Sequence, residues 1–192
     1  MESRKAVLEE ITLRLEEQDV PYMLIGGIAN LVWGRPRLTR DLDIVVMCPQ
    51  AGIPVFLQRM NRFFRLMPRD PLSFVQETSV LPLIAGDGTP IDLMFARLPY
   101  EETAIGRAVD MVLHGVRVKV CTAEDLIIHK VISERAIDRE DVKGIIATRG
   151  TSLDRDYLDP IVRELSGFLD RPEIWTYYLE CCAEIQPRPA GP

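Results

Sequence analysis

Three aspartates in two apolar stretches are placed where their carboxylates could act together. Asp41 and Asp43 are two residues apart at the start of the apolar run 42–47, and Asp92 interrupts the apolar run 90–96. Alternate residues of a strand share one face, so Asp41 and Asp43 would project side by side. If the two strands are neighbours, Asp92 joins them. Close like charges then favour a divalent cation, although an arginine that neutralises Asp92 is an alternative.

A pair of glycines precedes these acids. The apolar run 22–25 is suited to a buried strand, and Gly26 and Gly27 directly follow it. Glycine lets the backbone turn sharply and approach a ligand closely. Residues 28–33 then predict a short helix, whose free N-terminal N–H groups favour a phosphate. The sequence therefore predicts a phosphate-binding turn beside a pair of carboxylates.

The glycine pair, a gap of thirteen residues and the Asp-x-Asp pattern resemble the signature of the DNA polymerase β-like nucleotidyltransferase superfamily. The fuller pattern, Gly-Gly-Ile-Ala and then Gly-x-x-Arg-x-Thr-x-Asp-Leu-Asp, is most similar to the bacterial minimal nucleotidyltransferases, and among them to the AbiEii and MenT-type toxin enzymes. The resemblance extends to about residue 145. It implies an α/β nucleotidyltransferase fold, a mixed sheet flanked by helices, followed by a C-terminal helical subdomain. Asp41, Asp43 and Asp92 would be the catalytic and Mg²⁺-binding residues.

The resemblance also implies a reaction. A nucleoside monophosphate would pass from a nucleoside triphosphate such as ATP to an acceptor hydroxyl, by a two-metal mechanism that releases pyrophosphate. Gly26, Gly27, Arg37 and Thr39 would bind the nucleotide, although a solvated loop is an alternative for Arg37 and Thr39. The acceptor would be RNA such as tRNA, or protein, in a toxin with a cognate antitoxin. The alternatives are an antibiotic nucleotidyltransferase and a non-catalytic, nucleotide-binding partner protein.

A second group of charged residues lies in the C-terminal half. Lys130, Arg135, Asp138 and Asp141 have a spacing that resembles the C-terminal motifs of the AbiEii and MenT relatives. There the lysine binds nucleotide phosphate and an aspartate of the Asp-x-x-Asp pair completes the site. Lys130, Asp138 and Asp141 are therefore candidate nucleotide-binding residues. This chain departs from those relatives in having Ile137 where they carry a basic residue. The alternative is a set of solvated ion pairs on helix surfaces, which contribute little to stability.

Periodicity and turn residues predict the remaining elements. Two hairpins are expected, one joining 80–85 to 90–96 and one joining 109–113 to 116–120. The expected amphipathic helices are 6–15, 55–66, 124–135, 138–148, 158–169 and 173–185. We therefore expect a nucleotidyltransferase α/β domain over residues 1–120, a helical subdomain over 121–186 and a disordered tail over 187–192.

Composition limits the ligands and the cellular compartment that we expect for the protein. The 192 residues include 23 Lys and Arg against 29 Asp and Glu, a net charge of −6, which argues against a protein that coats nucleic acid broadly. It allows a local basic patch, and the predicted helix 55–66 and its end carry Arg59, Arg62, Arg65 and Arg69 as candidate contacts for RNA phosphates; a solvated helix face is the alternative. The sequence shows no membrane-spanning run, no signal peptide and no zinc spacing among its four cysteines. We therefore expect a cytoplasmic protein with reduced thiols.

Overall fold

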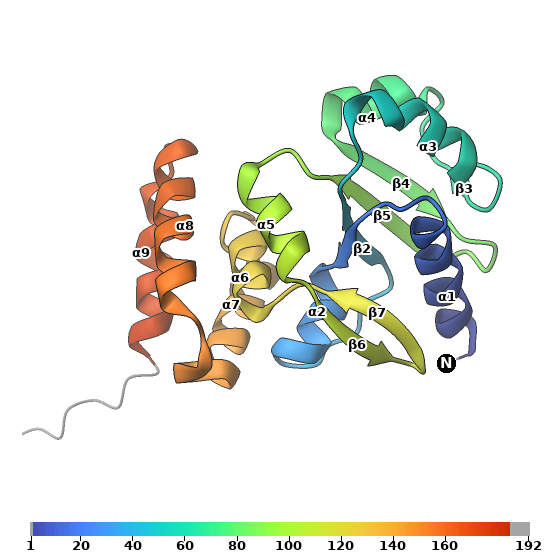
Figure 1. The fold of residues 1–192 in the computed structure, drawn as a ribbon. Coiled ribbons are helices and arrows are strands. Elements are labelled where there is room, and N and C mark those ends of the chain that lie inside the picture. The colour runs from blue at the N-terminus through green and yellow to red at the C-terminus, as the bar shows by residue number, and fades with distance from the viewer. Residues whose placement is uncertain (1, 185–192) are drawn as a thin grey trace, which may run out of the picture. The chain divides into compact units, whose positions relative to one another are not determined.

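The structure is a computed structural model and describes residues 2–184 (Figure 1). The predicted disordered tail and the last residue of the predicted helix 173–185 lie outside this range. The chain divides into two compact units. The sheet unit comprises the residues up to 28 and residues 38–122, and the helical unit comprises residues 29–37 and those from 123 onward. Each unit is described by itself.

A mixed sheet forms the centre of the sheet unit. In the described part of the chain it has seven strands, in the order β3-β4-β5-β2-β1-β7-β6. Strand β2 pairs in parallel with β5 and antiparallel with β1, and β1 pairs in parallel with β7. The strands are β1 (Tyr22–Leu24), β2 (Leu42–Val46), β3 (Arg65–Leu66), β4 (Val80–Ile84), β5 (Pro90–Phe95), β6 (Val109–Leu113) and β7 (Val116–Val120). Both predicted hairpins are confirmed, as β4–β5 and β6–β7.

Alternation of side chains gives the central part of the sheet one buried face. Leu81 and Leu83 of β4 and Ile91 and Leu93 of β5 are all buried. Their neighbours along each strand, Asp92 among them, are only partly buried. A period of two residues places alternate side chains on opposite faces. The sequence pattern therefore turns Asp92 away from the apolar core, onto the partly exposed face.

Helices of the sheet unit cover its apolar surface. Helix α1 (Glu2–Glu16) buries Leu8, Ile11 and Leu15, as its periodicity predicts. The other helices of this unit are α3 (Ile53–Met60), α4 (Pro71–Thr78) and α5 (Pro99–Arg107). Helix α2 (Gly26–Trp33) begins in the sheet unit, and its residues from Ala29 onward belong to the helical unit.

The predicted helix 55–66 is wrong in its second half. Helix α3 ends at Met60, and Arg65–Leu66 forms the edge strand β3, which pairs with β4. Phe63, in the turn after α3, is 43% exposed, with the Arg14 guanidinium 3.8 Å from its ring centre. Bonding to the open edge of β4 satisfies the backbone of this segment in place of further helix turns.

The sequence analysis did not predict two short helices, α4 and α5. Pro71 and Pro99 begin these helices, at the position where a missing N–H costs nothing. The Asp70 side chain caps α4 by accepting a hydrogen bond from the Ser73 backbone N–H at 3.2 Å. At the start of α5, the side chain of Glu101 in the first turn accepts a hydrogen bond from the backbone N–H of Leu98, the residue before the helix, at 2.8 Å.

The helical unit confirms the four predicted C-terminal helices with shifted ends. They are α6 (Ala123–Val131), α7 (Ala136–Arg149), α8 (Arg155–Phe168) and α9 (Pro172–Ala183). Helix α6 packs on α7 and α8, and α9 packs on α7 and α8; Figure 1 shows α8 and α9 side by side. Within the described residues, no helix combines the length and the apolar character that crossing a membrane requires.

Candidate functional site

Two of the predicted aspartates face each other across neighbouring strands. In the parallel pair of β2 and β5, Asp43 lies opposite Asp92, between the pairs Leu42–Ile91 and Ile44–Leu93. Residues opposite each other on paired strands project to the same face of a sheet. The carboxylates of Asp43 and Asp92 therefore share the partly exposed face. The two strands are therefore neighbours, which is the condition for Asp92 to lie near the Asp41–Asp43 pair.

The glycine turn lies directly beneath one of these carboxylates. Gly26 has a backbone φ of +61°, and a Cβ atom added there would lie only 1.9 Å from Oδ2 of Asp43. The Ile25 N–H donates a 2.9 Å hydrogen bond to the carbonyl oxygen of Asp43, which fixes the turn against β2. Glycine is therefore required at position 26 by both the left-handed backbone and the close approach of the acid.

Thr39 contacts both Gly27 and Asp41. Its side chain is buried, with 6% of the residue exposed, and its hydroxyl donates a 2.9 Å hydrogen bond to Oδ1 of Asp41. A Cβ atom at Gly27 would lie 2.4 Å from the Thr39 hydroxyl oxygen. Arg4 donates to the Thr39 carbonyl oxygen. Sequence analysis missed Arg4, because its partner is a backbone carbonyl that no side-chain pattern reveals.

The electrostatics of this group favour a cation. Burial, and then the negative charge of Asp41, raise the pKa of the Asp92 carboxyl above its usual value. Carboxylate oxygens are the donors that Mg²⁺ prefers, so the donor set fits a hard divalent cation. The tight metal-binding cluster expected from the sequence is not formed, however. Across residues 2–184 no three Asp, Glu, His or Cys side chains converge closely enough to hold an ion.

The second predicted group forms a buried cluster in the helical unit. Lys130 is only 3% exposed, and its ammonium donates 2.7 Å hydrogen bonds to Oδ1 of Asp138 and Oδ2 of Asp141. Arg37 binds both oxygens of Asp141 at 2.9–3.1 Å. The alternative of solvated ion pairs on a helix surface is therefore wrong for Lys130. Two carboxylates from α7 compensate a lysine at a buried position of α6.

Further polar groups complete this cluster. Asn30 donates to Oδ1 of Asp141 at 3.1 Å and to the Arg35 carbonyl oxygen at 2.9 Å. Ser133 and Arg135 donate to the other oxygen of Asp138. Burial alone would raise the pKa of Asp138, but the hydrogen bonds from Lys130, Ser133 and Arg135 outweigh it and lower that pKa.

Arg139 does not take the place of the basic residue that Ile137 replaces. Its guanidinium lies 4.2 Å from the ring centre of Tyr177 on α9. Asn30 and Ser133 are members of the cluster that the sequence analysis did not identify. The Asn30–Asp141 bond spans 111 positions, so no local pattern could have revealed it.

The mixed sheet, with the glycine turn before β2 and β5 beside β2, is a nucleotidyltransferase fold. The chain is similar to a number of solved structures, of which three are described. The antibiotic-resistance factor ANT(2'')-Ia has a TM-score of 0.58 at 14% identity, over 89% of this chain and 95% of that one. An antigenic nucleotidyltransferase-like protein from Paracoccidioides brasiliensis has a TM-score of 0.53 at 17% identity, over 95% of each chain. The lincosamide antibiotic adenylyltransferase LnuA has a TM-score of 0.50 at 16% identity, over 73% of this chain and 95% of that one.

At the level of sequence, no family model and no curated protein matches the chain. At identities of 14–17%, the structural likeness shows the fold and leaves the chemistry to be argued from the residues.

Proposed function

We propose that the chain is a nucleotidyltransferase, which transfers a nucleoside monophosphate from a nucleoside triphosphate to an acceptor hydroxyl. The observation that carries this proposal is the pairing of Asp43 with Asp92 on adjacent strands, with the Asp43 carboxylate directly over Gly26. Paired carboxylates beside a tight glycine turn are suited to a metal-bound triphosphate. The nucleotidyltransferase fold supports the same conclusion.

Asp41, Asp43 and Asp92 are the residues that would hold Mg²⁺. When bound, the metal ions lower the pKa of the attacking hydroxyl and neutralise charge on the triphosphate. The raised pKa of Asp92 supports this assignment, because a nearby cation would relieve the repulsion between Asp92 and Asp41. Gly26 and Gly27 allow the backbone to approach the phosphates, and Thr39 orients Asp41.

The reaction balances with these groups. The acceptor oxygen forms a bond to the α-phosphorus, the bond from that phosphorus to the bridging oxygen breaks, and pyrophosphate leaves. The acceptor hydroxyl must lose its proton. Asp92 is the candidate base, because its carboxylate shares the face of Asp43, beside the place where the acceptor hydroxyl would be held.

In the helical unit we propose Arg37, Lys130, Asp138 and Asp141 as nucleotide-binding residues. An ammonium group has three N–H donors, and the bonds to Asp138 and Asp141 account for two of them. The third could reach a phosphate without breaking either bond. The Arg37 guanidinium is held by Asp141 but is 28% exposed, so it too could meet an anion.

The acceptor and the biological setting are finer proposals. The resemblance of the sequence motifs supports a cytoplasmic, MenT-like or AbiEii-like toxin that modifies RNA or protein and has a cognate antitoxin. A small-molecule acceptor is the second candidate, because two of the similar structures, ANT(2'')-Ia and LnuA, are described by their antibiotic substrates or resistance. A partner that binds nucleotide without catalysis would have no use for three neighbouring aspartates.

The test is a transfer assay with the full chain. Each of the four triphosphates, labelled at the α-phosphate, is incubated with Mg²⁺ and with tRNA, a protein extract or aminoglycosides in turn. We expect label on one acceptor class, lost on chelation and reduced about a thousandfold or more by Asp43→Asn, since metal stabilisation is worth several kcal/mol. Asp110→Asn, at an exposed position of β6, is the control and should leave transfer unchanged. If no acceptor is labelled and no triphosphate binds, the proposal is wrong.

A further inference from the structure

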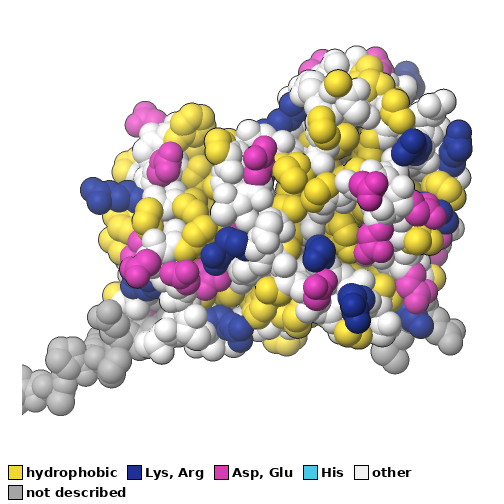
Figure 2. Space-filling model, in the orientation of Figure 1, with side chains coloured by type: hydrophobic (Ala, Val, Ile, Leu, Met, Phe, Trp, Pro, Cys, Tyr) yellow, Lys and Arg dark blue, Asp and Glu magenta, His cyan; other side chains and the backbone are white. Residues whose placement is uncertain are grey.

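An eleven-residue segment of the sheet unit carries a dense positive charge. Residues 59–69 contain four arginines and no acidic residue, in a chain whose net charge is −6. We call these four exposed residues the arginine edge: Arg59, Arg62, Arg65 and Arg69. Figure 2 shows Lys and Arg side chains lying among Asp and Glu side chains on one face of the sheet unit. The arginine edge differs from this mixed charge.

The charges of the arginine edge are not neutralised within the described chain. None of its four guanidinium groups forms an ion pair with a carboxylate in residues 2–184. The nearby Arg14 shows the contrast, because it pairs with Glu10 at 2.8 Å and with Glu17 at 2.7 Å. Each guanidinium group can bind a phosphate through two N–H donors at once. Four such groups without a carboxylate partner, within eleven residues, therefore attract a polyanion with regularly spaced phosphates.

The pairing of strands places Arg65, the member of the arginine edge that lies in β3, on the face that carries the aspartates. The Met67 N–H donates to the Pro82 carbonyl oxygen at 3.1 Å, Pro82 lies opposite Asp92, and Asp92 lies opposite Asp43. One row of residues thus crosses the sheet from the arginine edge to the acids. Arg65 precedes Met67 by two positions and shares its face.

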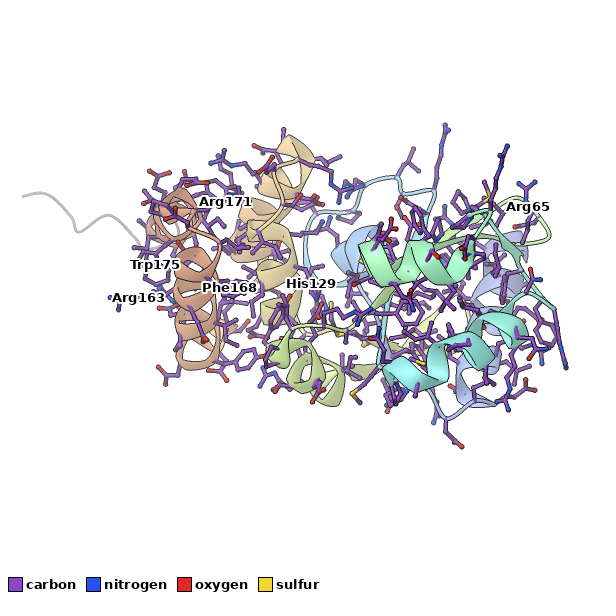
Figure 3. All side chains as sticks on the ribbon, turned by 90° about the horizontal axis from the view of Figure 1, so that it is seen from above. Arg65, His129, Arg163, Phe168, Arg171 and Trp175 are labelled. Atoms are coloured by element: carbon purple, nitrogen blue, oxygen red, sulfur yellow. The ribbon has the colours of Figure 1, made fainter. Side chains whose placement is uncertain are left out.

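The separation suits an extended polymer. Strand β3 is two strands away from β5, and adjacent strands lie about 4.8 Å apart, so the edge is roughly 10 Å from Asp92 across the sheet. Figure 3 shows Arg65 at the outer edge of the sheet unit. Met67, which is 49% exposed, lies between Arg65 and Arg69 in the chain and offers apolar surface to bases. Phe63 is 43% exposed and already has the Arg14 guanidinium over one face of its ring. A small acceptor at the aspartates would not need cations spread along this edge.

We propose that the arginine edge binds the phosphodiester backbone of a single-stranded RNA, whose terminal hydroxyl is the acceptor at Asp41, Asp43 and Asp92. This inference rests on the proposed function for the role of the hydroxyl, but the binding surface stands on its own. RNA is the occupant favoured by the observations, because it is a flexible polyanion with unstacked bases and terminal 2′ and 3′ hydroxyls.

The test measures binding of a short, fluorescently labelled single-stranded RNA to the full chain by anisotropy, without metal or triphosphate. We expect tight binding at low salt and a log–log salt slope of roughly −3 for four contacts, since each phosphate contact on a single strand contributes about −0.7. Replacing all four arginines by glutamine should weaken binding more than tenfold and flatten the slope. Its melting temperature should match that of the wild type, which separates lost binding from misfolding.

A control variant replaces four other exposed cations: Lys5, Arg117, Lys119 and Arg163. Both variants lose four positive charges, which takes the net charge from −6 to −10, so the total charge is matched. In the control, Lys5 and Lys119 are paired with Glu9 and Asp110, whereas the four arginines have no carboxylate partner in the described residues. The control should bind RNA nearly as the wild type does. Equal losses in both variants, or no RNA binding by the wild type at low salt, would overturn the proposal.

Two further ligands decide whether the occupant is RNA. A single-stranded DNA of the same sequence keeps the phosphates and bases but lacks the 2′ hydroxyl. Vesicles containing an anionic lipid present negative charge without bases. We expect RNA to bind more tightly than either. Equal or tighter binding of the vesicles or of the DNA would contradict the assignment to RNA. Because no triphosphate is present, failure here leaves the proposed transfer reaction untouched, and failure of transfer leaves RNA binding measurable.

Discussion

Two groups of aspartates, one in each unit, meet opposite environments. In the sheet unit, burial and the charge of Asp41 raise the pKa of Asp92. In the helical unit, burial of Asp138 is outweighed by hydrogen bonds from Lys130, Ser133 and Arg135, which lower its pKa. The acids of the helical unit thus have cations supplied by the chain. In the sheet unit burial and then the charge of Asp41 raise the pKa of Asp92, so Asp92 would gain from a cation supplied from outside. The same side chain can therefore serve stability in one place and binding in another.

The largest expected effect is on the buried lysine. Lys130→Ala should lower the free energy of unfolding by about 3–5 kcal/mol, because it leaves Asp138 and Asp141 buried without their shared cation. Chemical denaturation measures this directly. The control is Lys143→Ala. Lys143 lies on α7, the helix that carries Asp138 and Asp141, but it is only partly buried. This change should alter the unfolding free energy by no more than about 0.5 kcal/mol. Equal stabilities of the two variants would show that the cluster does not hold the helical unit together.

The smallest expected effect has the opposite sign. A carboxyl whose pKa is raised in the folded state destabilises the fold once it is ionised, so the cost of Asp92 is present at neutral pH and vanishes below its unfolded pKa of about 3.9. Asp92→Asn should therefore raise the melting temperature at pH 7, without divalent ions, by about 1–3 °C. The gain should disappear below about pH 4.

Asp138→Asn is the matched comparison for this change. The pKa of Asp138 is lowered in the folded state, so its ionised form stabilises the fold above the unfolded pKa and this stability is lost as the pH falls. The variant should therefore melt below the wild type at pH 7. Calorimetry over a series of pH values measures both variants. A lower melting temperature for Asp92→Asn at pH 7 would contradict the view that repulsion dominates at this site.

The elements that sequence predicted well are those whose signals are local. The hairpin β4–β5 was found because two alternating runs flank an Asp-Gly turn. Strand β3 was missed because Arg65–Leu66 is too short to show a period of its own and exists through pairing with Ile84 and Leu83. Helices α4 and α5 were missed for a different reason, since proline favours the first turn of a helix as well as ending one.

In the candidate site, too, local patterns reveal some residues and contacts between distant positions decide the others. The chain positions of Asp41, Asp43 and Asp92 were readable because strand periodicity and the glycine pair are local patterns. Whether Lys130 is buried was not readable, because a lysine on an apolar helix is tolerated only through partners on another helix, Asp138 and Asp141. Contacts between positions distant in the chain are decided by packing, which a single sequence does not display.

The measurement that tests the central claim most directly is divalent-cation binding by the sheet unit's aspartates. Mn²⁺, which prefers the same oxygen ligands as Mg²⁺, is titrated into the full chain with ATP present and followed by electron paramagnetic resonance. The Mn²⁺ bound by ATP alone is measured without protein and subtracted. After this correction the wild type should bind Mn²⁺, and Asp43→Asn should bind it at least tenfold more weakly than the wild type. Asp110→Asn should bind it as the wild type does. Mn²⁺ binding that is unchanged in Asp43→Asn would contradict the claim that these aspartates form the metal site of a nucleotidyltransferase.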